Sequence, residues 1–188
     1  MRKGTFFVLL LAMFVLGGCT GGDVSLVQDG TMNGYESTTI GKAFEASFDS
    51  PKWETFETDK GARVVQFTGK VSKAMHDSYR QELMNDYDSR EQAKGIAVHT
   101  VNTIFGPDKL EALIASYSGQ GYDDPQRAAI AHAFEEVATW KAGAPVLFQW
   151  TINTNGDTFK LTYLQSEAWK YLNGNSMTMD EVLHRIYN

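Results

Sequence analysis

Two runs of alternating apolar and polar residues near the C-terminus restrict the fold more than any other feature of this chain. They cover residues 146–152 and 159–164, and the short loop between them contains Asn155-Gly156. Asn-Gly between two alternating runs is a strong signal for a β-hairpin. Side chains alternate between the two faces of a strand, so Trp150 and Phe159 are expected on the same buried face.

The segment that precedes residue 72 carries one helix signal and one strand signal. Residues 40–49 place apolar side chains at helical spacing behind Thr39, which is a suitable N-cap. Ser50-Pro51 is expected to end this helix, because the residue before a proline avoids the α region. Trp53 and its neighbours then predict an irregular piece, and residues 62–71 predict a strand.

Residues 73–140 differ in kind and predict a run of helices. Two segments are expected near 73–94 and 96–105, a third opens at Pro107, and a fourth opens at Asp124-Pro125. Proline fits the first turn of a helix, because no intrahelical partner is lost there.

The C-terminal residues predict one more helix with a well-defined start. Thr178 and Glu181 form the S/T-x-x-E capping box, and Met177 and Val182 can pack together across the cap. Together these signals predict an α+β fold in which a small antiparallel sheet packs against helices. The helical segment 73–140 is then an insertion between the first strand and the C-terminal hairpin.

The N-terminus carries an export signal that ends at the only cysteine of the chain. Arg2 and Lys3 precede an apolar run over residues 6–16, which is too short for a membrane-spanning helix of about 20 residues. The sequence Leu16-Gly17-Gly18-Cys19 resembles the bacterial lipobox. The resemblance implies cleavage after residue 18 and acylation of Cys19, so that lipid holds the mature protein on a bilayer. Because residue 20 is Thr rather than Asp, the resemblance favours attachment to the outer membrane if the host is Gram-negative.

A second resemblance covers two stretches of the folded part. The patterns TIGKAF, PKW and VVQFTG, followed by the hairpin VLFQWTINTNGDTFKLTYL, resemble a small domain of uncharacterised bacterial lipoproteins. The resemblance implies a fold and a cell-envelope location, and it brings no activity. The sequence therefore predicts three parts: a signal peptide at 1–18, a flexible tether at 19–38 and a single domain at 39–188. Val24, Val27 and Tyr35 are expected to dock on that domain.

Charge narrows the choice of partners. Removal of residues 1–18 takes away two of the 17 basic residues and none of the 23 acidic ones, so the net charge falls from −6 to −8. An acidic chain is a poor candidate for binding nucleic acid, whose phosphates attract basic surfaces. The expected partners are the bilayer, through acylated Cys19, and a protein or cell-wall component of the envelope.

The residue types that carry catalysis or metal binding form only weak patterns. His132 and Glu136 would share a helix face and are weak candidates for a metal pair, although a solvated ion pair explains them as well. No nucleophile motif occurs, and no cofactor is expected. Trp169 and Tyr171 lie in an expected loop, where exposed aromatic rings could form a binding surface.

Three functions remain open from the sequence. The first is a non-enzymatic binding or interaction domain in the envelope. The second is a hydrolase or metal-dependent enzyme, which requires His99 or His132 to meet two carboxylates. The third is a small-ligand carrier, which requires a dry cavity of at least ~300 Å³ between sheet and helices.

Overall fold

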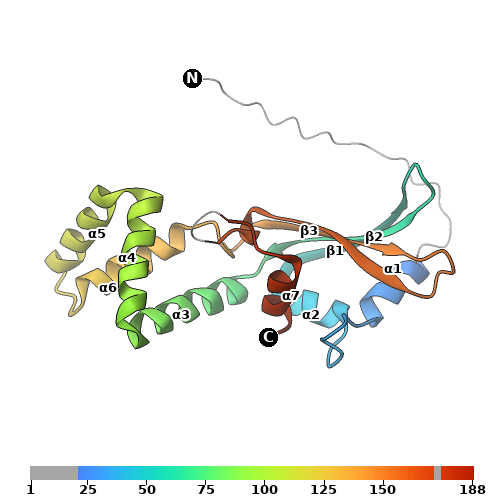
Figure 1. Ribbon diagram of the computed structural model, residues 1–188, viewed down its shortest axis with the longest axis horizontal. Helices are drawn as coiled ribbons and strands as arrows, with labels where there is room; N and C mark the ends of the chain where they lie inside the picture. The colour runs from blue at the N-terminus through green and yellow to red at the C-terminus, as the bar shows by residue number, and fades with distance from the viewer. Residues whose placement is uncertain (1–20, 172–174) are drawn as a thin grey trace, which may run out of the picture.

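The computed structural model describes residues 21–171 and 175–188, and it contains the predicted hairpin. β3 (Pro145–Ile152) pairs antiparallel with β4 (Phe159–Gln165), with Trp150 opposite Leu161. β2 (Arg63–Val71) pairs with the other edge of β3. With β1 (Phe48–Glu57), the described residues form a four-stranded antiparallel sheet in the order β1-β2-β3-β4 (Figure 1).

The irregular piece expected around Trp53 is a strand, so that prediction is wrong. β1 pairs with β2 along its length, with a bulge between Asp49 and Lys52. Pro51 lies inside this bulge, and Ser50 before it has a left-handed φ of 54°. Proline is tolerated at bulges and on edge strands, because no ladder hydrogen bond is lost there. The expectation that Ser50-Pro51 ends the helix is also wrong, because α2 already ends at Ser47 and β1 begins at Phe48.

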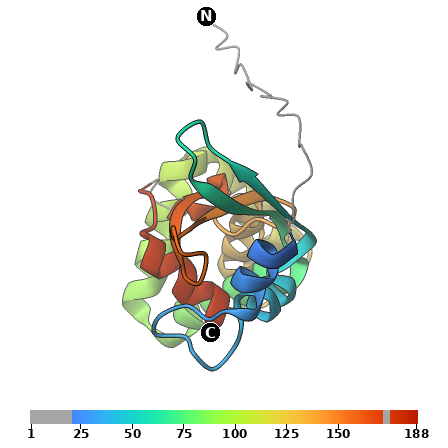
Figure 2. The ribbon, with the colours of Figure 1, turned by 90° about the vertical axis from the view of Figure 1, so that its right-hand side faces the viewer.

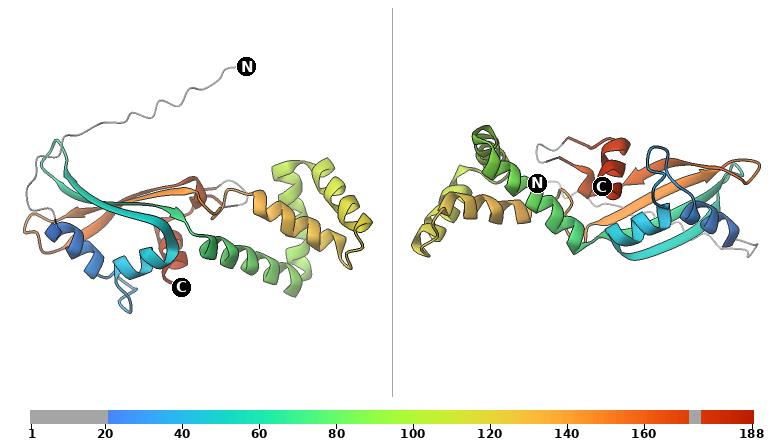
Figure 3. Two further views of the ribbon diagram at one scale, coloured as in Figure 1. Left: turned by 180° about the vertical axis from the view of Figure 1, so that it is seen from behind. Right: turned by 90° about the horizontal axis from the view of Figure 1, so that it is seen from below.

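Helices cover one face of the sheet, and the α+β class is confirmed. α2 (Ile40–Ser47) begins behind the Thr39 cap and α7 (Met179–Tyr187) behind the Thr178 capping box, both as predicted. Together with α1 (Gly21–Asp29) they lie on the same side of the strands (Figures 2 and 3). The Phe44 ring of α2 lies 4.7 Å from the Phe148 ring and 5.4 Å from the Trp150 ring between centroids. This core of aromatic rings joins the helices to the sheet.

The flexible tether expected over residues 19–38 is wrong for the part that the structure describes. Residues 21–29 form α1, and Val27 is fully buried in the sheet core. Tyr35, in the loop after α1, stacks on Tyr187 with 4.6 Å between ring centroids. The expected docking of Val24, Val27 and Tyr35 is thus confirmed, and this segment is part of the domain.

The inserted segment forms a helical lobe with its own core. It lies between β2 and β3, as predicted, and extends away from the sheet (Figure 1). Its helices are α3 (Lys73–Ser89), α4 (Glu91–Phe105), α5 (Pro107–Gly119) and α6 (Pro125–Glu136). We call α3 to α6 the helical lobe, and the sheet with α1, α2 and α7 the sheet lobe.

Helix α3 connects the two cores. Near its start Tyr79 packs in the core of the sheet lobe, and further along Met84 and Tyr87 pack in the core of the helical lobe. Leu83 lies between them and contacts both. One of the two connections between the lobes is therefore a continuous helix, and the other is the segment 137–144 that leads from α6 back to β3.

Candidate functional site

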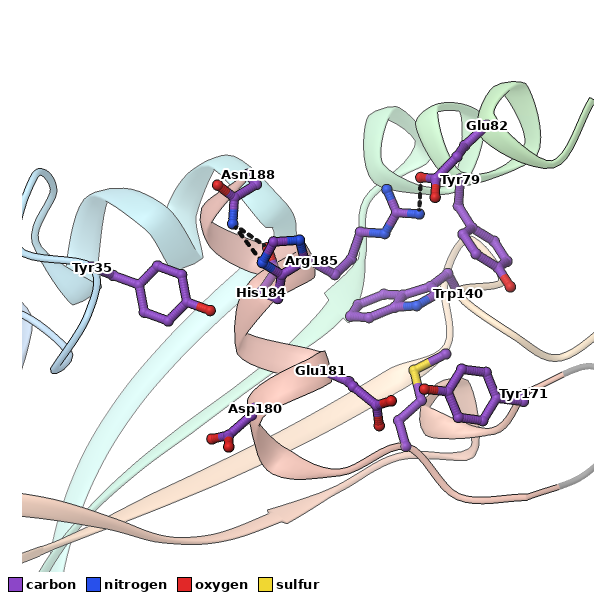
Figure 4. Close-up of a pocket in the computed structure, with 11 residues that line it drawn as sticks. Tyr35, Tyr79, Glu82, Trp140, Tyr171, Asp180, Glu181, His184, Arg185 and Asn188 are labelled. Carbon is purple, nitrogen blue, oxygen red and sulfur yellow. Dashed lines mark hydrogen bonds and ion pairs between the residues drawn. The ribbon is translucent and has the colours of Figure 1, made fainter. Parts of the chain in front are cut away.

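A groove of about 650 Å³ lies where the two lobes meet. Its walls are formed by α7 along its whole length, the middle of α3 and the chain around Trp140 (Figure 4). Four aromatic side chains line it, and they come from distant parts of the sequence: Tyr35, Tyr79, Trp140 and Tyr171. Concave surfaces with aromatic walls and a few polar groups are the usual form of ligand sites.

One ion pair crosses the groove from the sheet lobe to the helical lobe. Arg185 of α7 donates to the carboxylate of Glu82 on α3. The Arg185 guanidinium also lies 4.9 Å from the centre of the Tyr79 ring (Figure 4). Burial raises the pKa of the Tyr79 hydroxyl, so this ring stays neutral at physiological pH. The contact therefore places a cation against a neutral, electron-rich ring.

The start of α7 supplies two further carboxylates. Glu181 closes the capping box, in which its side chain accepts hydrogen bonds from the backbone N–H and the hydroxyl of Thr178. Hydrogen bonds from the Tyr171 hydroxyl and from Thr178 hold the pKa of Glu181 below its ordinary value. Asp180 is exposed, and its side chain points away from Tyr171 and Glu181, to the other side of α7 (Figure 4). The first turn of α7 therefore carries two carboxylates, and Arg185 lies further along the same helix.

A polar network fixes the position of Trp140. His76 on α3 places Nε2 2.7 Å from the Glu135 carboxylate and Nδ1 3.1 Å from the Trp140 carbonyl oxygen. Trp140 has a φ of 49°, in the left-handed region that side chains other than glycine disfavour. Its ring is 1% exposed and meets the Trp169 ring edge to face at 4.8 Å. Such strain persists only where the surroundings hold it, and it is common at binding sites.

Of the two aromatic residues expected to form a binding surface, one lies in the core and one lines the groove. Trp169 is 4% exposed and packs on Trp140 and Phe148, so its expected role in a surface is wrong. It ends the short helix η1 (Glu167–Trp169), which directs its ring inward. Tyr171, two residues later, is 36% exposed and faces the groove.

The expected metal candidates are engaged elsewhere. His132 lies 2.9 Å from the Tyr117 hydroxyl, and Glu136 lies 3.9 Å from the Lys141 ammonium. No group of three or more His, Cys, Asp or Glu side chains able to hold a metal occurs within residues 21–171 and 175–188. The four histidines lie on four different helices, and His99 and His132 do not meet the paired carboxylates that an enzyme hypothesis requires.

The groove also differs from the dry cavity of the carrier hypothesis. Its volume exceeds ~300 Å³, but it opens between α3 and α7 and is lined by charged groups. Sequence reasoning missed Tyr35, Tyr79 and Arg185 as groove residues. Two sequence signals pointed to this region: Tyr171, expected in a binding surface, and the capping box at Thr178, which fixed where α7 begins.

The predicted acylation site Cys19 and the predicted signal peptide at 1–18 lie outside the described residues. No helix in the described part of the chain is both long and apolar enough to cross a bilayer. Comparisons with protein-family models, with curated proteins and with solved structures give no match to this chain. The function is therefore argued from the groove and from the sequence motifs alone.

Proposed function

We propose that this protein is a lipid-anchored, non-enzymatic binding protein of the bacterial cell envelope, and that the groove between its lobes holds the ligand. The groove is the observation that carries the binding role, because it gathers four aromatic side chains and several charged groups in a concave surface. The export signal and the lipobox residues Leu16 to Cys19 support the anchor and the location.

The polar groups of the groove support binding rather than catalysis. Glu82 and Arg185 neutralise one another, and Glu181 is held by the cap of its own helix. Each of these side chains has a structural partner that fixes its position and its charge. Preorganised groups of this kind favour recognition of a ligand, since little ordering is needed when it binds.

The docked α1 sets the distance between the anchor and the domain. Only residue 20 separates Cys19 from the first residue of α1, and two residue steps span at most about 7 Å. An acylated Cys19 would hold the sheet lobe directly at the bilayer surface. Since α1 lies at the end of the sheet lobe that is remote from α3 to α6, the helical lobe would point away from the membrane (Figure 1).

Mass spectrometry of the protein from fractionated cells tests the anchor. We expect loss of residues 1–18, a mass gain that fits two or three acyl chains, and release of a Cys19→Ala variant from membranes. A mature protein that carries no lipid and is soluble would contradict the anchor.

Hydrogen exchange tests the groove without knowledge of the ligand. The mature protein is compared alone and with separate envelope fractions: cell-wall fragments, lipid vesicles and small soluble molecules. We expect one fraction to protect the first turn of α7 and the chain around Trp140, and a Tyr171→Ala variant to lose that protection. Protection confined to other surfaces, or none from any fraction, would contradict the proposed binding site.

A further inference from the structure

Two polar groups in the wall of the groove lack a partner, and both belong to buried side chains that line it. Tyr79 is 9% exposed, and its hydroxyl forms no hydrogen bond to another described residue. Trp140 is more deeply buried, and its indole N–H has no hydrogen-bond partner within residues 21–171 and 175–188. Polar groups on buried side chains usually have a partner, so the groove holds two donors that a ligand can satisfy.

Both donors face the same part of the groove. In Figure 4 the Tyr79 hydroxyl and the indole nitrogen of Trp140 lie on the sides of their rings that face Tyr171, across the groove. The other three indole N–H groups are also unpaired, but they are fully shielded from solvent: Trp53, Trp150 and Trp169. Trp140 is therefore the tryptophan whose N–H a ligand in the groove can reach.

The charges beside Tyr79 favour a ligand that is negative. Two guanidinium groups lie against its ring, Arg185 at 4.9 Å and Arg80 at 5.3 Å from the ring centre. Arg185 forms an ion pair with Glu82, so its charge is balanced within the groove. Arg80 has no ion pair with a described residue, so its charge remains.

Arg80 thus carries a buried charge without a direct counter-ion. Its Nη2 donates to the Val137 carbonyl oxygen, and its Nε and Nη1 have no partner among the described residues. Glu135 acts on Arg80 from a distance, but its side chain is 55% exposed, so water screens its charge. Arginine stays ionised when it is buried, and an unbalanced charge in the interior is costly. A negative ligand beside Tyr79 would offset part of this cost.

We propose that the groove binds a carboxylate, which accepts hydrogen bonds from the Tyr79 hydroxyl and the Trp140 indole N–H. The apolar part of the ligand lies on the Tyr171 ring and separates this carboxylate from Glu181. Hydrogen bonds to an ionised acceptor are stronger than those to a neutral one, so two donors suffice to orient the group. This inference rests on the proposed binding function and names the chemical class of the ligand. Two sources share this chemistry, a free organic acid and the C-terminus of a peptide.

Calorimetric titration with defined probes tests the inference. The probes are N-acetylphenylalanine, its neutral C-terminal amide, and 3-phenylpropanoate. We expect both acids to bind and the amide to bind about tenfold more weakly, because it lacks the charge. Tighter binding of N-acetylphenylalanine identifies a peptide C-terminus as the source, and tighter binding of 3-phenylpropanoate identifies a free acid.

Matched variants place the carboxylate in the groove. Tyr79→Phe keeps the ring that packs in the core of the sheet lobe, and it should weaken binding of both acids about tenfold, as expected for one hydrogen bond to a charged group. Tyr87→Phe is the control, because Tyr87 is a buried tyrosine of the same helix whose hydroxyl bonds Gln126 in the helical lobe. Arg80→Met should lower the preference for acid over amide severalfold, since it removes the unbalanced charge.

The indole N–H signals in a proton–nitrogen NMR spectrum give a second readout. Either acid should shift the Trp140 signal more than those of the three shielded indoles, because only the Trp140 N–H is expected to bond the carboxylate. Binding that leaves the Trp140 signal in place would overturn the inference, since the acid would then lie elsewhere.

The other outcomes distinguish this inference from the proposed function. Equal effects of Tyr79→Phe and Tyr87→Phe, or equal binding of acid and amide, would overturn the carboxylate site. If neither acid binds while hydrogen exchange shows another component in the groove, the inference fails and the binding function stands. If no acid binds and nothing protects the groove, both fail.

Discussion

Replacement of Tyr187 by phenylalanine should stabilise the protein, although it removes a polar group from a partly buried residue. The Tyr187 hydroxyl is fully shielded from solvent, and it has no hydrogen-bond partner among the described residues. The ring stacks on Tyr35, which lines the groove, and phenylalanine preserves that contact. An unpaired buried hydroxyl costs roughly 1–3 kcal/mol, so Tyr187→Phe should raise the free energy of unfolding by about 1 kcal/mol.

Urea denaturation at pH 7 measures this difference. With a slope of roughly 2 kcal/mol per M, a gain of about 1 kcal/mol moves the midpoint upward by ~0.5 M. Tyr163→Phe is the matched control, since the Tyr163 hydroxyl is on an exposed side chain and bonds only Gln165. The control should change stability by less than ~0.5 kcal/mol. If Tyr187→Phe instead lowers the free energy of unfolding by more than ~0.5 kcal/mol, the hydroxyl has a partner and the reasoning is refuted.

The same substitution should change the response to alkaline pH. Burial, and then the nearby Tyr35, raise the pKa of Tyr187 well above its ordinary value of 10.0. A group whose pKa is raised by folding contributes its full stability below the unfolded pKa and loses it as pH rises toward the folded pKa. Wild-type protein should therefore lose stability above pH 10 relative to Tyr187→Phe. Burial also raises the pKa of Tyr79, but Tyr79 is present in both proteins and does not affect the comparison.

Three further substitutions test how the sheet lobe is held together. Gly30→Ala should destabilise by about 1–3 kcal/mol in thermal denaturation, because a Cβ there would lie 2.5 Å from the Phe159 ring. Gly22→Ala, in the first turn of α1, is the control: a Cβ there meets no atom within 4 Å, so this change should not destabilise the protein. Thr178→Ala should cost about 1 kcal/mol by urea denaturation through loss of the α7 cap, and the circular dichroism of the native state should be unchanged. Phe44→Ala should cost about 3–5 kcal/mol in the same assay, because its fully buried ring contacts the centre of the aromatic core.

Elements with strong local signals could be predicted from the sequence. The hairpin, the caps at Thr39 and Thr178, and the Asp124-Pro125 helix start follow rules that act within a few residues. The insertion between β2 and β3 was also predictable, because helical spacing replaces alternation over a long stretch. In each case the local preference and the tertiary packing agree, which is typical of natural sequences.

The two errors in the fold arise where packing overrides composition. The glycine-rich and polar segment 21–38 has the composition of a linker, but Val27 finds a buried site in the sheet core, and this fixes α1. Pro51 is a strong stop signal, yet the bulge in β1 accommodates it at the edge of the sheet. Neither outcome depends on the local sequence alone, because both require the surface of β2 and its neighbours to be in place.

The groove could not be predicted for a related reason. Its aromatic residues span positions 35 to 171, and each of them alone is explained equally well as part of a core. Trp140 illustrates the difficulty, since the contacts that hold its left-handed backbone come from distant parts of the chain: His76 lies beside its carbonyl oxygen, and the Ala168 carbonyl accepts from its N–H. The site is a property of the junction between two cores. That junction depends on α3, which belongs to both cores. A change in the packing of either core should therefore change the shape of the groove.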